Sequence, residues 1–348
     1  MRLPVLKELS AIDQTPVTST APPPLARLAR MLDAWLLVLL LGVYALAAFL
    51  PTMGILIRKQ VVFGNPLPVV LLSAMLLSAG IGIEAREVRH AIGSWWQVLI
   101  GCVLLVAAPW LVVSILGLGS SFFPPGILAG LALVALMPSA ASSVAWTQLS
   151  RGNVAVNVAL ILLSTLATPL LLGLFWDGGE SNFGEAGLPI ISVGVWIIPS
   201  ILLGVLIRYL AGEARIAAIR PMLKVGSATI LLLLNYINAS VALPEFVGNF
   251  QPGILFVLTL TVLVTCGSVF AVTYLATSWL KTPAPQARAL WFGIGMKNTG
   301  MALVLAAIWL EDSPLALVTI ISYTFTQHLL SAAIHQRTLP ADAMPKQD

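Results

Sequence analysis

Residues 135–143 read Ala-Leu-Met-Pro138-Ser-Ala-Ala-Ser-Ser, and residues 293–300 read Gly293-Ile-Gly295-Met-Lys-Asn-Thr-Gly300. Each stretch lies in the middle of a long apolar segment. Pro138 removes a backbone donor and is followed by small residues, while three glycines surround a lysine in the second stretch, so we expect both helices to break here. The predicted helix-break residues are Pro138, Gly293, Gly295 and Gly300.

The composition around these stretches is that of a membrane protein. Of 348 residues, 59% are hydrophobic and 9% are charged, against about 25% charged in soluble domains. The mean hydropathy is +0.97. Such a chain is not a soluble enzyme, a nucleic-acid-binding protein or a disulfide scaffold. Cys102 and Cys266 lie within apolar stretches and are interpreted as small buried hydrophobic residues.

The apolar runs predict an all-α polytopic membrane protein with ten transmembrane helices, because a spanning helix needs about 20 apolar residues. Barrel strands would alternate in polarity, and these runs do not. The predicted spans are 34–57, 67–83, 94–118, 124–150, 153–176, 188–210, 221–243, 253–280, 287–310 and 313–335. Residues 1–32 are predicted to be a mostly disordered N-terminal tail, 33–336 the transporter domain, and 337–348 a C-terminal tail.

Basic residues fall almost entirely on one predicted side of the membrane. The other side has only Arg58 and Lys59. The first side carries fifteen of the 18 basic residues: Arg2, Lys7, Arg27, Arg30, Arg86, Arg89, Arg151, Arg208, Arg215, Arg220, Lys224, Lys281, Arg288, Arg337 and Lys346. By the positive-inside rule, both termini are predicted to be cytoplasmic.

Arg208, Lys224 and Arg288 lie within four residues of the end of a predicted span. Lys297 is the one Lys, Arg, Asp or Glu deeper inside a span, where a lysine costs about 2.5–3.5 kcal/mol on insertion scales. The two broken helices are the fourth of the first five and the fourth of the last five. This arrangement predicts two inverted five-helix repeats and a secondary transporter with its site where the breaks meet. The alternative is a simple kink at Pro138, with the glycines acting as helix-packing contacts.

Two motifs resemble the bile acid:sodium symporter family. They are the run from Pro138 to Asn153, followed by Leu163-Ser164-Thr165 and Pro169, and the run from Gly295 to Gly300, in which the family ordinarily has Gln in place of Lys297. The resemblance implies discontinuous, crossed helices 4 and 9. It also implies a panel domain of helices 1, 2, 6 and 7, a core domain of helices 3–5 and 8–10, and transport of organic anions, often with sodium.

The family's sodium ligands are poorly kept in this sequence. Ser143 matches, but the resemblance places the other ion-site positions on Val144, Asn157, Ile161, Gly293, Lys297 and, by a looser alignment, Leu104. Sodium needs several oxygen ligands, and here the family's glutamate falls on Gly293 while Lys297 adds a cation. The sodium sites are therefore expected to be non-functional, although sodium remains possible, and no other cofactor, metal site or catalytic residue is predicted.

Lys297 has three open interpretations besides a purely structural one. It replaces sodium by bracing the negative C-terminal ends of the half-helices, it pairs with an anionic substrate, or it couples transport to protons. His328 is a second candidate proton carrier, but a hydrogen-bonded structural histidine is commoner. Asn235 and Asn238 either face the cavity or hold helices together.

The combined prediction is a secondary transporter of a small organic anion that works by alternating access in the bacterial inner membrane. Its partners are the lipid bilayer and the substrate, with no nucleic acid. Crossed half-helix N-termini are expected to bind the substrate together with Ser142, Ser143, Lys297, Asn298 and Thr299. The alternatives are a sodium-independent exchanger or proton-coupled carrier of the same fold, and a non-transporting membrane sensor or intramembrane enzyme. An arsenite carrier would be expected to have a cysteine in the fourth helix, and none is there.

Overall fold

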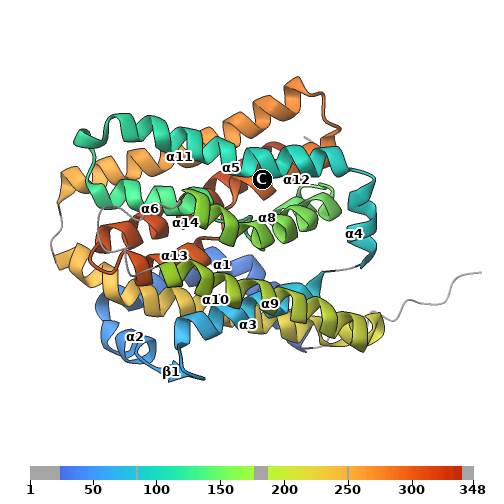
Figure 1. Ribbon diagram of the computed structural model, residues 1–348, viewed down its shortest axis with the longest axis horizontal. Helices are drawn as coiled ribbons and strands as arrows, with labels where there is room; N and C mark the ends of the chain where they lie inside the picture. Colours follow the sequence, from blue (N-terminus) through green and yellow to red (C-terminus); the bar gives the residue numbers. More distant parts are fainter. Residues whose placement is uncertain (1–23, 84, 176–186, 249–250, 339–348) are drawn as a thin grey trace, which may run out of the picture.

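The computed structural model describes residues 24–83, 85–175, 187–248 and 251–338, which are almost entirely helical (Figure 1). The first helices are α1 (Pro24–Phe49), α2 (Pro51–Arg58), α3 (Leu67–Gly82), α4 (Ala85–Ile92) and α5 (Trp95–Leu118). They are followed by α6 (Pro125–Leu136), α7 (Ser143–Leu149), α8 (Val154–Phe175), α9 (Gly187–Ala211), α10 (Glu213–Gly248), α11 (Pro252–Trp279), α12 (Ala284–Gly295), α13 (Thr299–Trp309) and α14 (Pro314–Thr338). A hairpin of β1 (Val61–Val62) and β2 (Asn65–Pro66) and a 3-10 turn at Ser120–Phe122 complete the described elements.

The helices form two layers. The first layer contains α1, α2, α3, α9 and α10, with α1 packed on α10 and α3 on α9; it lies along the lower side of Figure 1. The remaining large helices form the second layer, in which α6 packs on α14 and α11 packs on α12. Helix α10 joins the layers, because it also packs against α13 and α14.

The surface of the molecule is suited to lipid. Helices α5, α8, α10, α11 and α14 are long and apolar enough to cross a membrane, and the bent pair α1–α2 makes a sixth candidate among the described residues. On α5 the exposed side chains include Leu99, Val103, Leu111 and Ile115, all of which are apolar. An apolar surface of this kind is stable only when lipid covers it. The prediction of an all-α polytopic membrane protein is therefore confirmed.

The N-terminal part differs from the prediction in two ways. Residues 1–32 were expected to be a mostly disordered tail whose end, from Arg27 to Asp33, lies flat at the interface, but α1 begins at Pro24 and runs without a break to Phe49. The first predicted span, 34–57, is also not one straight helix, because α1 and α2 meet at an angle of 93°. Pro51 explains the bend, since proline disfavours the helical conformation of the residue before it. Residues 1–23 and 339–348 of the predicted tails lie outside the described residues.

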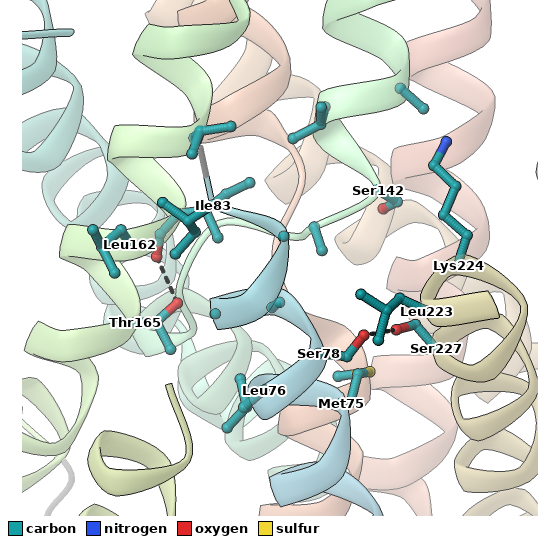
Figure 2. Close-up of a pocket in the computed structure, with 18 of the residues that line it drawn as sticks. Met75, Leu76, Ser78, Ile83, Ser142, Leu162, Thr165, Leu223, Lys224 and Ser227 are labelled. Carbon is teal, nitrogen blue, oxygen red and sulfur yellow. Dashed lines mark hydrogen bonds between the residues drawn. The ribbon is translucent and has the colours of Figure 1, made fainter. Parts of the chain in front are cut away.

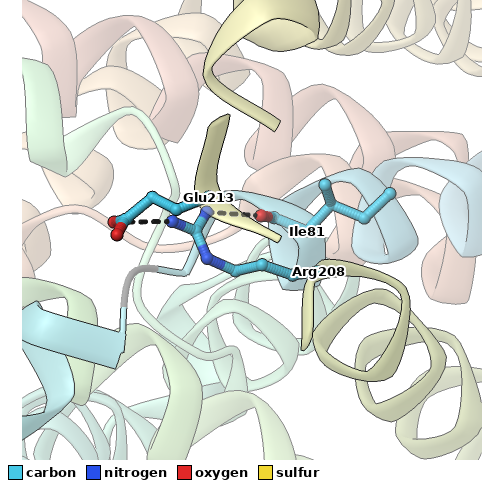
Figure 3. A network of polar contacts seen from close by, with 3 residues as sticks. All are labelled: Ile81, Arg208 and Glu213. Atoms are coloured by element: carbon cyan, nitrogen blue, oxygen red, sulfur yellow. Dashed lines mark hydrogen bonds and ion pairs between the residues drawn. The ribbon is translucent and has the colours of Figure 1, made fainter. Parts of the chain in front are cut away.

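Arg208 ties three helices of the first layer together at the end where α3 stops. Its Nη1 donates to the carbonyl oxygen of Ile81 at 2.9 Å, and its Nη2 lies 3.5 Å from a carboxylate oxygen of Glu213 (Figure 3). The carbonyls in the last turn of a helix have no helical donor, so a buried guanidinium stabilises that end. Arg208 thus holds the ends of α3 and α9 against the start of α10.

Candidate functional site

Both predicted breaks are present, and they meet. Helix α6 ends at Leu136 and α7 begins at Ser143, while α12 ends at Gly295 and α13 begins at Thr299. The intervening strands form an antiparallel bridge between Ser139 and Lys297. The amide of Ala140 donates to the Met296 carbonyl at 2.9 Å, and the amide of Asn298 donates to the Pro138 carbonyl at 2.8 Å. We call these two non-helical segments, 137–142 and 296–298, the crossing. Each segment satisfies backbone groups that the other helix break has freed, as burial requires.

Two side chains complete the hydrogen bonding of the crossing. Gln327 of α14 accepts from the amide of Lys297 through Oε1 at 2.8 Å and donates through Nε2 to the carbonyl of the same residue at 3.1 Å. The Oγ of Ser164 on α8 accepts from the amide of Ser139 at 3.1 Å. The crossing is therefore held by α8 and α14 as well as by itself.

The ammonium of Lys297 is completely buried and makes three hydrogen bonds to backbone carbonyls. Its Nζ donates to the carbonyl oxygen of Leu105 at 2.5 Å, of Met137 at 3.1 Å and of Ala135 at 3.2 Å. Pro109 in α5 has no amide hydrogen with which to satisfy the Leu105 carbonyl four residues earlier, and the end of α6 frees the other two acceptors. Lys297 therefore caps the end of α6 and supplies the donor that the Leu105 carbonyl lacks in α5. All three N–H donors of its ammonium are used.

The glycines of the second motif lie beside the break, which corrects their predicted role. Gly293 and Gly295 are inside α12, and Gly300 is inside α13. A Cβ atom on residue 295 would overlap the ring of Phe270, so this glycine permits close packing. At Gly293 a Cβ atom would lie 3.2 Å from Oδ1 of Asn157. Gly293 and Gly295 are therefore close-packing positions next to a break that is present.

Ser143 and Asn157, two of the predicted ion-site residues, are fully buried and bonded to each other. The Oγ of Ser143 donates to Oδ1 of Asn157 at 2.9 Å, and Nδ2 of Asn157 donates to Oγ1 of Thr147 at 2.5 Å. Asn157 also faces the backbone of Gly293, as the close approach at that glycine shows. Ser143, Asn157 and Gly293 are therefore together. Their polar groups satisfy one another, and the charged buried residues in the described part of the chain are Arg208 and Lys297, with no Asp or Glu.

A cavity of about 450 Å³ lies between the two layers and reaches the crossing (Figure 2). The second layer contributes Ser139, Ser142 and Asn298 from the crossing and Thr165 from α8. Most other lining residues are apolar, among them Leu76 and Leu162. On the first layer, Ser78 of α3 accepts a 2.8 Å hydrogen bond from Ser227 of α10, and the lining includes the basic residues Arg220 and Lys224 and no acidic residue among those described.

The predicted substrate-binding residues divide into two groups. Ser142 and Asn298 line the cavity, whereas Ser143, Lys297 and Thr299 are buried next to it and are not among its lining residues. Asn298 is the N-cap of α13, and its Oδ1 accepts from the amide of Met301 at 3.1 Å. Its Nδ2 is then the atom of this side chain that is suited to donate to an anion in the cavity.

Sequence reasoning missed several residues of the site. Gln327 carried a usable signal, because an amide within an apolar helix needs a partner. Ser139 lies in the stretch 135–143 but was not predicted to bind the substrate. Ser78, Ser227, Arg220 and Lys224 gave no signal, since one-dimensional patterns do not show which serines and basic residues of the first layer face the second.

A family profile and two of three relatives indicate a membrane transporter. A profile of the SBF-like CPA transporter family matches residues 34–338. YocS of Bacillus subtilis (strain 168), named an uncharacterized sodium-dependent transporter, is 29% identical over 262 residues, which cover 72% of this chain and 75% of that protein. The uncharacterized protein YbaS of the same organism is 26% identical over 59% of this chain and 67% of its own length. A probable sodium/metabolite cotransporter, the chloroplastic BASS2 of Oryza sativa subsp. japonica, is 30% identical over 46% of this chain and 39% of its own length.

Proposed function

The chain belongs to the SBF-like CPA transporter family and is a membrane transporter of the bile acid:sodium symporter type, not an enzyme. We propose that this transporter carries a small organic anion by alternating access without using sodium. The observation that carries the proposal is the cavity, which lies between the two helix layers and ends at the crossing. A site bounded by two bodies that can move relative to each other is what alternating access requires.

In this proposal the two layers are the two moving bodies. The first layer, with α1, α3, α9 and α10, is the panel domain, and the second layer is the core domain. The ten spans then form two inverted five-helix repeats, in which the pairs α6–α7 and α12–α13 are the broken fourth helices. The breaks occupy equivalent positions and bond to each other, which supports this assignment.

The cavity favours an anion with an apolar body. Its lining holds Arg220 and Lys224 and no acidic residue among those described, and Ser142 and Asn298 present polar side chains at the crossing. A carboxylate at the crossing would accept hydrogen bonds from Asn298 Nδ2 and the Ser142 hydroxyl. The apolar walls between these polar groups and the two basic residues would contact the rest of the substrate.

The residues present do not fit a sodium site of the kind that the family resemblance implies. A sodium ion needs several oxygen ligands, usually with a carboxylate, whereas Oδ1 of Asn157 already accepts from Ser143, its Nδ2 is a donor, and no Asp or Glu is buried among the described residues. The buried ammonium of Lys297 also repels cations. The carbonyls of Leu105, Ala135 and Met137 bind that ammonium. We therefore propose that Lys297 replaces sodium by bracing the C-terminal ends of the half-helices. We predict sodium-independent transport, even though two of the relatives have sodium in their names.

The test is uptake of a series of radiolabelled carboxylates into proteoliposomes, measured with and without sodium and with and without a proton gradient at fixed membrane potential. We expect saturable uptake that is unchanged when choline replaces sodium. Preloading with unlabelled substrate identifies an exchanger, and a response to the proton gradient identifies a proton-coupled carrier. Uptake that rises steeply with sodium contradicts the proposal, and binding without uptake would indicate a sensor.

A further inference from the structure

One face of α10 carries a file of residues that begins at the cavity and continues beyond it. Ser227, Leu231, Asn235 and Asn238 follow one another at intervals of four, four and three residues, so they lie above one another on the helix. Ser227 and Leu231 line the cavity. A Cβ atom on Gly300 of α13 would lie 3.4 Å from Cδ1 of Leu231. The file therefore follows the seam between α10 and the second layer, past the crossing.

The two asparagines of this file are in opposite situations. Asn235 is satisfied, because its Oδ1 accepts from the hydroxyl of Tyr44 at 2.5 Å and its Nδ2 donates to the carbonyl of Leu231 at 2.7 Å. Asn238, one turn further, is completely buried, and neither its Oδ1 nor its Nδ2 has a hydrogen-bond partner. An asparagine that held helices together would bond across the seam. A buried amide without a partner instead destabilises the conformation that buries it.

The seam is closed at the end remote from the cavity by contacts between the layers. Nη2 of Arg58, the last residue of α2, donates to the carbonyl of Ala307 at 2.6 Å, and Glu311 interacts electrostatically with the same arginine. The rings of Tyr44 and Phe325 pack edge to face with centroids 5.0 Å apart, which joins α1 to α14. Ala307 is nine residues beyond Asn298, roughly 13 Å along the helix axis.

We propose that this seam is the outer gate, closed here, and that Asn238 lines the outward-open cavity and donates to the anionic group of the substrate there. The inference rests on the proposed function, because it requires alternating access. When the layers separate, the amide of Asn238 gains water or the substrate anion as a partner. Asn238 then has two effects, since it disfavours the closed gate and it contacts the substrate when the gate is open.

The first test is cysteine accessibility in intact cells, in a Cys102→Ala, Cys266→Ala background that has been shown to transport. Thr52→Cys, exposed on α2, marks the outer side, and Val264→Cys on the exposed apolar face of α11 is the negative control. We expect an impermeant maleimide that reaches Thr52→Cys also to label Asn238→Cys, slowly, and to label it about tenfold faster when Arg58→Gln removes the gate contact. Absence of labelling at Asn238→Cys in a transporting protein, with and without Arg58→Gln, overturns the inference. Absence of carboxylate uptake by the wild-type protein in proteoliposomes would instead count against the proposed function.

The second test compares Asn238→Leu with its matched control Asn235→Leu, because the two positions differ in their partners. Asn238→Leu removes an unsatisfied amide, so we expect an unchanged or higher unfolding temperature with a transport rate lowered about tenfold. Asn235→Leu leaves the Tyr44 hydroxyl without its acceptor and should lower the unfolding temperature. Normal transport by Asn238→Leu, or a lower unfolding temperature than the wild type, contradicts the inference.

Discussion

The ammonium of Lys297 donates to the carbonyl oxygen of Leu105 at 2.5 Å, and this carbonyl is the one that Pro109 leaves without a helical donor. The same ammonium caps Ala135 and Met137 at the end of α6. One side chain from the second break therefore compensates for a proline in α5 and for the break in α6. Lys297 is thus tied to the architecture of the crossing and not to the surface of the cavity.

Replacing Lys297 by methionine should destabilise the protein, because three buried carbonyls would lose their donor. Each unsatisfied group costs about 1–3 kcal/mol, so we expect a loss of about 3 kcal/mol or more. Thermal unfolding in detergent measures it. Lys297→Gln, which keeps an amide donor, should lie between methionine and the wild type, whereas Lys59→Met, at an exposed position after α2, should unfold like the wild type. A Lys297→Met protein with wild-type unfolding temperature and uptake would refute the bracing role.

The two side-chain atoms of Asn298 have different proposed roles, because Oδ1 caps α13 and Nδ2 donates to the substrate, and a substitution can change one without the other. Asn298→Asp keeps the oxygen that accepts from Met301 but replaces the Nδ2 donor with negative charge. We expect unchanged stability and a rise in KM of about tenfold or more, since one charge-assisted hydrogen bond is worth roughly 1.5–3 kcal/mol. Asn298→Ala loses both functions and should also lower the unfolding temperature. If Asn298→Asp binds the substrate as tightly as the wild type, this amide does not contact the anion.

The orientation in the membrane is predicted from the charge bias and can be checked independently of transport. Arg58 and Lys59 are the two basic residues predicted on the outer side, so a reporter fused after Asp348 should be in the cytoplasm. A fluorescent protein at that position should fluoresce, and alkaline phosphatase should be inactive. The reverse pattern would place Arg58 and the proposed outer gate on the cytoplasmic side.

The sequence identified the broken helices because their signals are local. Pro138 and the polar run around Lys297 interrupt apolar segments, and both interruptions proved to be breaks that meet. The exact turn of the second break was not predictable, because Gly293 and Gly295 are required by contacts with Asn157 and Phe270 from other helices. The partners of Lys297 were also not predictable, since Pro109 shows that the Leu105 carbonyl lacks a helical donor but not that Lys297 lies within reach of it.

The final prediction concerns what it would take to make transport respond to sodium. Lys297→Gln removes the competing ammonium, and Gly293→Glu supplies the carboxylate that the family resemblance places there. The Gly293→Glu side chain does not fit as the protein stands, because even a Cβ atom on residue 293 would lie 3.0 Å from Cδ1 of Leu160 and 3.2 Å from Oδ1 of Asn157. Asn157→Ser shortens one of these neighbours and replaces an amide with a hydroxyl oxygen ligand. We therefore expect the double variant to be unstable and unresponsive, and the triple variant with Asn157→Ser to be more stable with sodium than with choline in a thermal unfolding assay. A sodium response in the double variant would show that the Asn157 side chain is not the obstacle, and a response in the wild type would show that Lys297 does not exclude the ion.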